Sequence, residues 1–314
     1  MVLCSRCGKA RSVIKLRYLG ETLCKNCFVE FFEEKVIKAL KDAGVLDNLS
    51  GKLVAVGVSG GKDSSNTLYV LNKLKEYFDF DLVGVCIDEG IVGYRDVKLK
   101  FLRNLCLSLG VELVEVKMER EMGISIDEVY RLRREKKIEL NPCGVCGVYR
   151  RYLLNRAARD LGADFVATGH NLDDEVQTLF INIFRGNYYN IAREGLYTVP
   201  IAEDLVPRIK PLYYTYEKES MVYFLLNKMY TPRVECPYAP ESERYYLRTW
   251  LNELELREPG TKWRILMFKM RLREKLLKVI PPPKLRKCDR CGQSTPNILC
   301  RACEIRVMIE RALS

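Results

Sequence analysis

Apolar runs of strand length alternate with helical patterns through the middle of the chain. The first apolar run, at 53–58, is followed at 64–77 by apolar residues at helical spacing. The same criteria predict strands at 82–87, 111–116 and 165–168, and helices at 97–109, 126–136, 145–161 and 172–184. Such alternation is typical of a parallel sheet with helices on both faces. The sequence therefore predicts an α/β fold with a doubly wound, Rossmann-like parallel sheet.

The segments outside this alternation predict further helices and two small appended modules. Helices are predicted at 29–44, 216–228, 244–255 and 263–279, and a loop-like stretch at 186–214. Three consecutive prolines at 281–283 form a stiff linker. We therefore expect a small module at 1–28, a central domain at 29–280 with a helical C-terminal part, and a second small module with a short helix at 281–314.

The central motif is Ser59-Gly60-Gly61-Lys62-Asp63-Ser64, which joins the first predicted strand to the following helix. The first N–H groups of a helix lack partners within the helix and carry partial positive charge. Two glycines allow a phosphate to approach the backbone, and the serines and Lys62 supply further donors. An ordinary turn capped by Asp63 is the structural alternative. The spacing G-x-x-x-x-G-K-[ST] of kinases and GTPases is absent. The motif resembles the PP-loop of ATP pyrophosphatases.

Two other candidate site segments lie at the ends of predicted strands, namely Ile87–Glu89, which contains Asp88, and the stretch from Thr168 and Gly169 to Asp174. Ligands of open α/β sheets bind beyond the carboxyl ends of the strands, so these residues are expected near the glycine turn. Asn171 is a favourable N-cap, and acidic residues suit the first turn of the helix that follows. Helix capping alone therefore explains the acids at 173–175. The alternative is that they handle Mg²⁺ or protons beside ATP phosphates.

Composition adds a candidate partner. Apolar residues make up 48% of the 314 residues, charged residues 30%, and the formal net charge is +11. This basic excess is typical of a protein with a polyanionic partner such as nucleic acid, and a solvated basic surface without a partner is the alternative that charge alone leaves open. We find neither a signal peptide nor an apolar run of transmembrane length, so we expect a soluble cytoplasmic protein without a membrane partner. The single histidine, His170, disfavours histidine-based metal sites and Ser-His-Asp catalysis.

Eight of the thirteen cysteines form two sets of paired C-x-x-C motifs, one at each end of the chain. The sets are Cys4, Cys7, Cys24 and Cys27, and Cys288, Cys291, Cys300 and Cys303. Four thiolates at this spacing are typical of a closed tetrahedral Zn²⁺ site. Two such ribbons suggest either nucleic-acid docking or structural clips. Cys86 and Cys106 stand alone in apolar stretches and are predicted to be core residues.

The remaining cysteines are Cys143, Cys146 and, much later, Cys236. We place the first two in a glycine-bearing turn before a helix. Three thiolates without a histidine are too few for a closed zinc site. They suit a [4Fe–4S] cluster with one iron left open. A redox dithiol with Cys236 as a third thiol, and simple burial, are alternatives that the spacing leaves open.

These motifs together make the chain resemble the tRNA 2-thiouridine synthetases of the TtuA, TtcA and NcsA group, over nearly its whole length. The resemblance lies in the glycine turn, Cys143-Gly-Val-Cys146, Thr168-Gly-His-Asn-Leu-Asp-Asp-Glu175 and Glu235-Cys236-Pro237-Tyr238-Ala239. Leu251-Asn-Glu-Leu254 and Pro259-Gly-Thr-Lys262 also look like TtuA. The two terminal ribbons are more similar to TtuA and NcsA than to TtcA, although they contain only cysteines rather than cysteine and histidine.

The resemblance implies an ATP-dependent tRNA sulfurtransferase. ATP with Mg²⁺ would bind the PP-loop, and the uridine C2 oxygen would be adenylated with release of pyrophosphate. Sulfur would then replace AMP to give 2-thiouridine. Cys143, Cys146 and Cys236 match the family's [4Fe–4S] ligands, Asp174 matches an acid that assists adenylation, and Asp88 matches an acid on the ATP side. The resemblance also allows either free sulfide or the thiocarboxylate of a ubiquitin-like carrier as the donor, and implies a homodimer.

Arg150 stands where TtuA proteins carry lysine, and an Arg-Arg pair after the C-x-x-C motif looks more like NcsA. Arginine keeps the positive charge of lysine but is not titratable. We expect uridine 54 as the target, with uridine 34 as the alternative. Other possibilities are the same fold using the three cysteines as persulfide or disulfide thiols, a PP-loop synthetase acting on a small molecule, and a non-catalytic zinc protein that binds nucleic acid.

Overall fold

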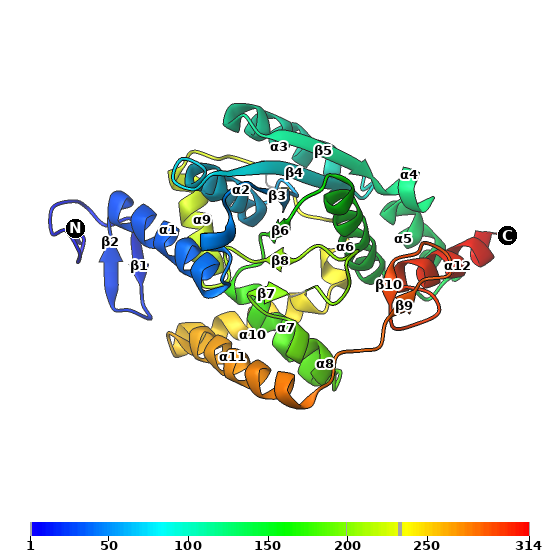
Figure 1. The fold of residues 1–314 in the computed structure, drawn as a ribbon. Helices are drawn as coiled ribbons and strands as arrows, with labels where there is room; N and C mark the ends of the chain where they lie inside the picture. Colours follow the sequence, from blue (N-terminus) through cyan, green and yellow to red (C-terminus); the bar gives the residue numbers. More distant parts are fainter. Residues whose placement is uncertain (1, 199, 232–233, 314) are drawn as a thin grey trace.

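A computed structural model describes residues 2–198, 200–231 and 234–313 (Figure 1). Its central sheet has six strands in the order β5-β4-β3-β6-β8-β7. The strands are β3 (Lys52–Gly57), β4 (Phe80–Asp88), β5 (Glu112–Lys117), β6 (Phe165–Thr168), β7 (Tyr197–Thr198) and β8 (Arg208–Ile209). All neighbours are parallel except the β7–β8 pair at one edge, which is antiparallel. The predicted doubly wound sheet is confirmed, with one added antiparallel edge strand.

Helices cover both faces of this sheet and form a further layer beside its β7 edge (Figure 1). They are α1 (Lys25–Asp42), α2 (Lys62–Leu74), α3 (Arg95–Leu109), α4 (Met118–Met122), α5 (Ile126–Arg134), α6 (Pro142–Asp160), α7 (Leu172–Phe184), α8 (Tyr188–Arg193), α9 (Glu217–Leu226), α10 (Arg244–Arg257), α11 (Thr261–Val279) and α12 (Arg301–Leu313). Short 3₁₀ turns are η1 (Leu46–Asn48) and η2 (Ala239–Glu241). No helix in the described parts of the chain is long and apolar enough to cross a bilayer.

The apolar residues of β3 divide the core between the two faces of the sheet. Successive side chains of a strand point to opposite faces. Val54 and Val56 pack with α1, α2 and α3, whereas Ala55 packs with α4, α5 and α6. All three β3 side chains are fully buried, which is why this strand reads as a continuous apolar run.

Each terminal ribbon belongs to one of these two cores. The N-terminal hairpin of β1 (Ile14–Leu16) and β2 (Glu21–Leu23) packs with α1 on the first face. The C-terminal ribbon, with β9 (Arg286–Lys287), β10 (Ser294–Thr295) and α12, packs against α6 on the second face. The ribbons therefore extend the core of the sheet domain at opposite ends of the molecule (Figure 1).

The structure corrects three local predictions. Helix α6 begins at Pro142 rather than at 145, so Cys143 lies in its first turn and Asn141 caps it by accepting a hydrogen bond from Gly144 N. Helix α1 begins at Lys25, four residues before its predicted start. The stretch 186–214 contains α8, β7 and β8 rather than only loop. These three elements are six residues or fewer, too short for a periodic apolar signal.

Candidate active site

The PP-loop connects β3 to α2 and is shaped by one glycine that tolerates no side chain. Gly60 has a φ of +73°, in the left-handed region. A Cβ at this position would also lie 2.8 Å from the carbonyl oxygen of Lys98. The chain turns here and then enters the first turn of α2 at Lys62, with Gly61 at the N-cap. The open N–H groups of that turn give the anion site that the sequence predicts.

The side chains of the PP-loop hold one another in place. Ser64 Oγ accepts a hydrogen bond from Ser59 N at 3.0 Å and lies 3.1 Å from Ser59 Oγ. The Lys62 ammonium lies 2.8 Å from Asp63 Oδ2 and 3.1 Å from Glu217 Oε1 on α9. Burial lowers the pKa of Lys62, but the attraction of the two carboxylates outweighs this effect, so the pKa is raised overall and Lys62 is a cation at neutral pH.

The segment after β6 lies directly against this loop. A Cβ on Gly169 would sit 2.7 Å from Ser64 N, so only glycine allows this approach. Asn171 Nδ2 donates to Asp63 Oδ1 at 3.2 Å, and the same side chain caps α7. Thr168 ends β6 opposite Gly57 of β3. The structure thus brings together the glycine turn and the Thr168–Asp174 segment, as their positions after neighbouring strands predict.

The three consecutive acids of α7 differ in their surroundings. Asp173 forms a short contact with the ammonium of Lys262, and Glu175 contacts Lys269 at 2.7 Å and Lys210 at 2.6 Å. Both of these acids are buried, so they serve as internal counter-charges. Asp174 is paired with Arg244 at 3.0 Å, and its side chain remains 29% exposed. Asp174 also closes the capping box of α7, because its Oδ2 accepts a hydrogen bond from Asn171 N at 3.1 Å. Capping therefore accounts for this acid, which is the only one of the three that is partly exposed rather than buried.

The pKa of Asp174 is raised to about 6, chiefly by burial and also by the neighbouring Asp63 carboxylate. Two carboxylates close to a phosphate site offer oxygen ligands of the kind that Mg²⁺ prefers. Asp88, at the end of β4, accepts a hydrogen bond from Gly90 N at 2.9 Å. It therefore stabilises the turn at the end of its own strand.

The pair that connects the PP-loop to α6 consists of Glu89, which lies in the candidate segment 87–89, and Arg95. Both side chains are 2% exposed, and Arg95 Nε donates to Glu89 Oε2 at 2.5 Å. Arg95 Nη1 also donates to the carbonyl oxygen of Ser59 at 2.8 Å. The other Glu89 oxygen lies 3.3 Å from Arg150 Nε. Glu89 follows a predicted strand, which is a weak signal, but nothing in the sequence marks Arg95.

Cys143, Cys146 and Cys236 gather at the start of α6. Cys143 Sγ donates to the carbonyl oxygen of Tyr238 at 3.0 Å, which ties the helix to the segment that carries Cys236. Burial raises the pKa of Cys143 to about 11 and that of Cys146 to about 12, and the pKa of Cys236 is also raised by burial. Without a bound metal these thiols stay protonated at neutral pH.

The terminal cysteine sets are much tighter. Among the described residues, each four-cysteine set has all its sulfur atoms within 4.8 Å of one another, whereas the three other cysteines form no set this close. The Cys7–Cys24 and Cys291–Cys300 sulfur distances are 3.8 and 3.6 Å. Tetrahedral ligation with Zn–S bonds of about 2.3 Å requires about 3.8 Å between sulfurs. The terminal sets fit a single zinc ion each.

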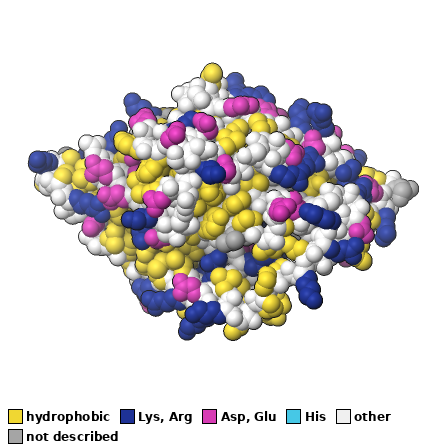
Figure 2. All heavy atoms as spheres, in the orientation of Figure 1, with side chains coloured by type: hydrophobic (Ala, Val, Ile, Leu, Met, Phe, Trp, Pro, Cys, Tyr) yellow, Lys and Arg dark blue, Asp and Glu magenta, His cyan; other side chains and the backbone are white. Residues whose placement is uncertain are grey.

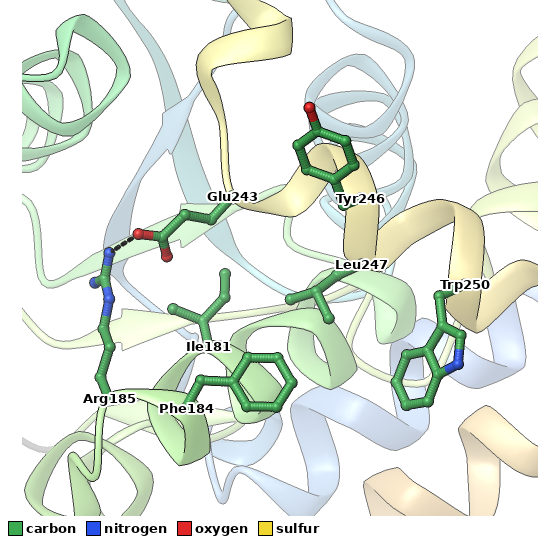
Figure 3. Close-up of a pocket in the computed structure, with 7 residues that line it drawn as sticks. All are labelled: Ile181, Phe184, Arg185, Glu243, Tyr246, Leu247 and Trp250. Carbon is green, nitrogen blue, oxygen red and sulfur yellow. Dashed lines mark hydrogen bonds and ion pairs between the residues drawn. The ribbon is translucent and has the colours of Figure 1, made fainter.

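A separate groove lies at the opposite end of α7, between α7 and α10 (Figure 3). It has a volume of about 520 Å³ and is lined mainly by Ile181, Phe184, Leu247 and Trp250. Its charged groups are one ion pair, Arg185 with Glu243 at 2.6 Å. The groove contains neither a thiol nor an unpaired carboxylate and is not the ATP site.

The fold and site define a PP-loop ATP-binding protein with two four-cysteine metal sites and a third, open cysteine site. A PP-loop domain family model matches residues 30–251. The model for the N-terminal LIM domain of the 2-thiouridine synthetase TtuA matches residues 3–29. The chain therefore belongs to the PP-loop tRNA 2-thiolation family, whose members include TtuA and NcsA.

Individual relatives agree with this assignment. Cytoplasmic tRNA 2-thiolation protein 1 of Danio rerio is 34% identical over 99% of this chain and 90% of its own. A probable sulfurtransferase of Methanocaldococcus jannaschii is 35% identical over 96% of this chain and 86% of its own. The solved U34-tRNA thiolase NcsA of Methanococcus maripaludis, which has a [4Fe–4S] cluster, superposes with a TM-score of 0.82 at 31% identity, covering 97% of this chain and 95% of NcsA.

Replacing Gly169 by alanine is expected to weaken ATP binding at least tenfold, by about 1.4 kcal/mol or more. The added methyl group would meet the backbone of Ser64 and Asp63 at 2.7–2.8 Å and displace the PP-loop. Isothermal titration calorimetry with ATP and Mg²⁺ measures the effect. Gly147→Ala is the control, because its Cβ would meet only the Arg151 side chain at 3.9 Å. Equal affinities for the two variants would contradict the close approach.

Replacing Glu89 by glutamine is expected to lower the free energy of unfolding by about 3–5 kcal/mol, because Arg95 would stay buried without a counter-charge. Urea denaturation followed by circular dichroism measures this. The matched control is Glu115→Gln, which breaks an ion pair with the 60% exposed Arg103. That change should cost about 1 kcal/mol or less. A similar loss of unfolding free energy in both variants would show that the buried Glu89–Arg95 pair contributes no more to stability than the exposed pair.

Proposed function

We propose that this protein catalyses ATP-dependent 2-thiolation of a uridine in tRNA. The observation that carries the proposal is the path Ser59–Arg95–Glu89–Arg150, made of two hydrogen bonds and one ion pair, which joins the PP-loop to the helix of Cys143 and Cys146. A nucleotide site and a sulfur site thus lie on one continuous scaffold. Two reactions at the same uridine carbon, activation and then sulfur transfer, need this arrangement.

In the first reaction the uridine C2 oxygen attacks the α-phosphorus of ATP, and pyrophosphate leaves. The N–H groups at the start of α2 and the Lys62 ammonium stabilise the negative charge of the leaving phosphates. Asp63 and Asp174 would hold the Mg²⁺ that accompanies ATP, and Asp88 would support the nucleotide side of the site. In the second reaction sulfide adds at C2, and AMP leaves with the original C2 oxygen.

Cys143, Cys146 and Cys236 would be the three ligands of a [4Fe–4S] cluster, since the trio lacks the fourth thiolate of a closed zinc site and its sulfurs do not all lie within 4.8 Å of one another. Such a cluster supplies an iron that can bind sulfide. Arg150, one helical turn after Cys146, places a permanent positive charge beside this region. The terminal sets each hold a structural Zn²⁺.

We assign the target to uridine 34, because the chain is similar to a U34-tRNA thiolase over nearly its whole length. This favours the alternative that the sequence ranked second to uridine 54. The relatives named as cytoplasmic support a cytoplasmic location. Free sulfide and a ubiquitin-like thiocarboxylate are both compatible with this site as sulfur donors. Mass spectrometry of oligonucleotides from tRNA treated with the enzyme locates the modified uridine.

Alanine variants of Cys143, Cys146 and Cys236 are each expected to lose the broad visible absorption of the cluster and all tRNA thiolation. Anaerobic purification should give about four irons per wild-type chain and about two zinc ions in every variant. The control is Cys106→Ala, which removes a buried core thiol far from the trio in sequence. Zinc without iron in the wild type, with thiolation intact, would overturn the cluster and favour persulfide chemistry.

The rate of pyrophosphate release is expected to depend on the ionisation of Asp174. Its pKa is raised to about 6, so the carboxylate needed for Mg²⁺ is present above this pH and is lost as the pH falls below it. The rate should therefore fall about tenfold per pH unit below pH 6. Asp174→Asn should be slow at every pH and lack this limb, whereas Asp47→Asn, an exposed acid of η1, should keep it. An unchanged profile in Asp174→Asn would exclude this role.

A further inference from the structure

Helix α11 distributes its charge unequally between its two sides. The helix contains seven basic residues and one acidic residue, Glu274. Lys262 and Lys269 point inward and neutralise the buried acids Asp173 and Glu175 of α7. These contacts fix α11 rigidly to the helix that carries Asp174. The basic residues on the other side of α11 do not take part in these buried ion pairs.

The outward side forms a strip that we define by Arg264, Phe268, Arg271, Lys275 and Lys278. At 100° per residue, these five positions fall within about 80° of one another around the helix axis, over a length of about 21 Å. All five residues are exposed, including the Phe268 ring at 59%. Dark blue Lys and Arg side chains follow the lower margin of the molecule in Figure 2, where Figure 1 places α11.

The charge of the α11 strip is largely uncompensated. Arg264 has a long ion pair with Glu258 at 3.4 Å. Glu274 is the one acidic residue of the helix and lies one turn from both Arg271 and Lys278, yet it forms no ion pair with either. Within the described part of the chain, Arg271, Lys275 and Lys278 have no carboxylate within 4.0 Å. Three neighbouring cations without partners repel one another, and a polyanion bound across them would relieve that repulsion.

We propose that the α11 strip binds the phosphate backbone of the tRNA substrate. This inference rests on the proposed function. A length of 21 Å spans roughly a dozen phosphate charges of a nucleic-acid duplex, so several can be contacted at once. The exposed Phe268 ring, between Arg264 and Arg271, offers a stacking surface for an unpaired base. A second copy of the chain is the poorer occupant, because a two-fold contact would place this basic strip against itself.

The test is the salt dependence of tRNA binding by full-length protein. The strip variant is Arg271→Glu with Lys275→Glu. Its matched control is Lys100→Glu with Lys117→Glu, which makes the same change in net charge on exposed residues of α3 and β5, at the opposite edge of the sheet. Dissociation constants for unmodified tRNA transcript are measured by filter binding at KCl concentrations from about 50 to about 300 mM. This range includes the physiological ionic strength of about 150 mM.

The strip variant is expected to bind tRNA at least tenfold more weakly, and the slope of log Kd against log salt should fall by about 2. The control variant should stay within about threefold of the wild type with nearly the same slope. ATP affinity and the visible spectrum should not change in either variant, which shows that both are folded. A KM for tRNA that rises with little change in kcat would agree with a role in docking alone.

Equal weakening of tRNA binding in both variants would overturn the proposal, because the effect would then come from the change in net charge and not from the position of the α11 strip. A strip variant that binds tRNA normally but changes its mass in light scattering would assign the strip to an interface between copies. In both cases a wild type that thiolates tRNA leaves the proposed function standing. A wild type that neither binds nor thiolates tRNA would refute both.

Discussion

The buried ion pair between Glu89 and Arg95 sets the geometry on which the rest of the site depends. A charged pair this deep is costly to desolvate, and its mutual attraction and further polar contacts offset that cost. Here those contacts reach outward from the pair, through a hydrogen bond to the carbonyl oxygen of Ser59 and an ion pair with Arg150. The pair thus holds the first residue of the PP-loop at a fixed distance from α6. A hydrophobic replacement would pack as well but could hold neither of these two elements.

The two ribbons act on the same scaffold from opposite faces of the sheet. Cys4 and Cys24 belong to the core that contains Val54 and Val56, whereas Cys288, Cys300 and Cys303 belong to the core that contains Ala55. Metal binding at the C-terminal set therefore also supports the packing of α6, and with it the position of Cys143 and Cys146. The ribbons are better understood as extensions of the two cores than as mobile arms for nucleic acid.

The sequence predicts those parts of the site that depend on local chemistry. The PP-loop, the cysteine sets and the strand ends are each marked by residues close together in the chain, and the sheet follows from the alternation of apolar periods. The roles of Asp173, Asp174 and Glu175 were not separable, because any of the three suits a helix N-terminus. The lysine partners of Asp173 and Glu175, Lys262 and Lys269, lie 89 and 94 residues away, so only the fold reveals that Asp174 is the acid that stays partly exposed.

The three cysteine sites show how spacing alone can divide structural from reactive metal chemistry. In the terminal sets, sulfurs about 3.7 Å apart close completely around one small ion. Such a site has no free position for a further ligand. In the trio the sulfurs are wider apart, buried enough to be protonated, and one thiolate short of a closed shell. A four-ligand metal group held by these cysteines would therefore have one position without a thiolate, and α6, which carries Cys143 and Cys146, is linked to the PP-loop through Arg150, Glu89 and Arg95.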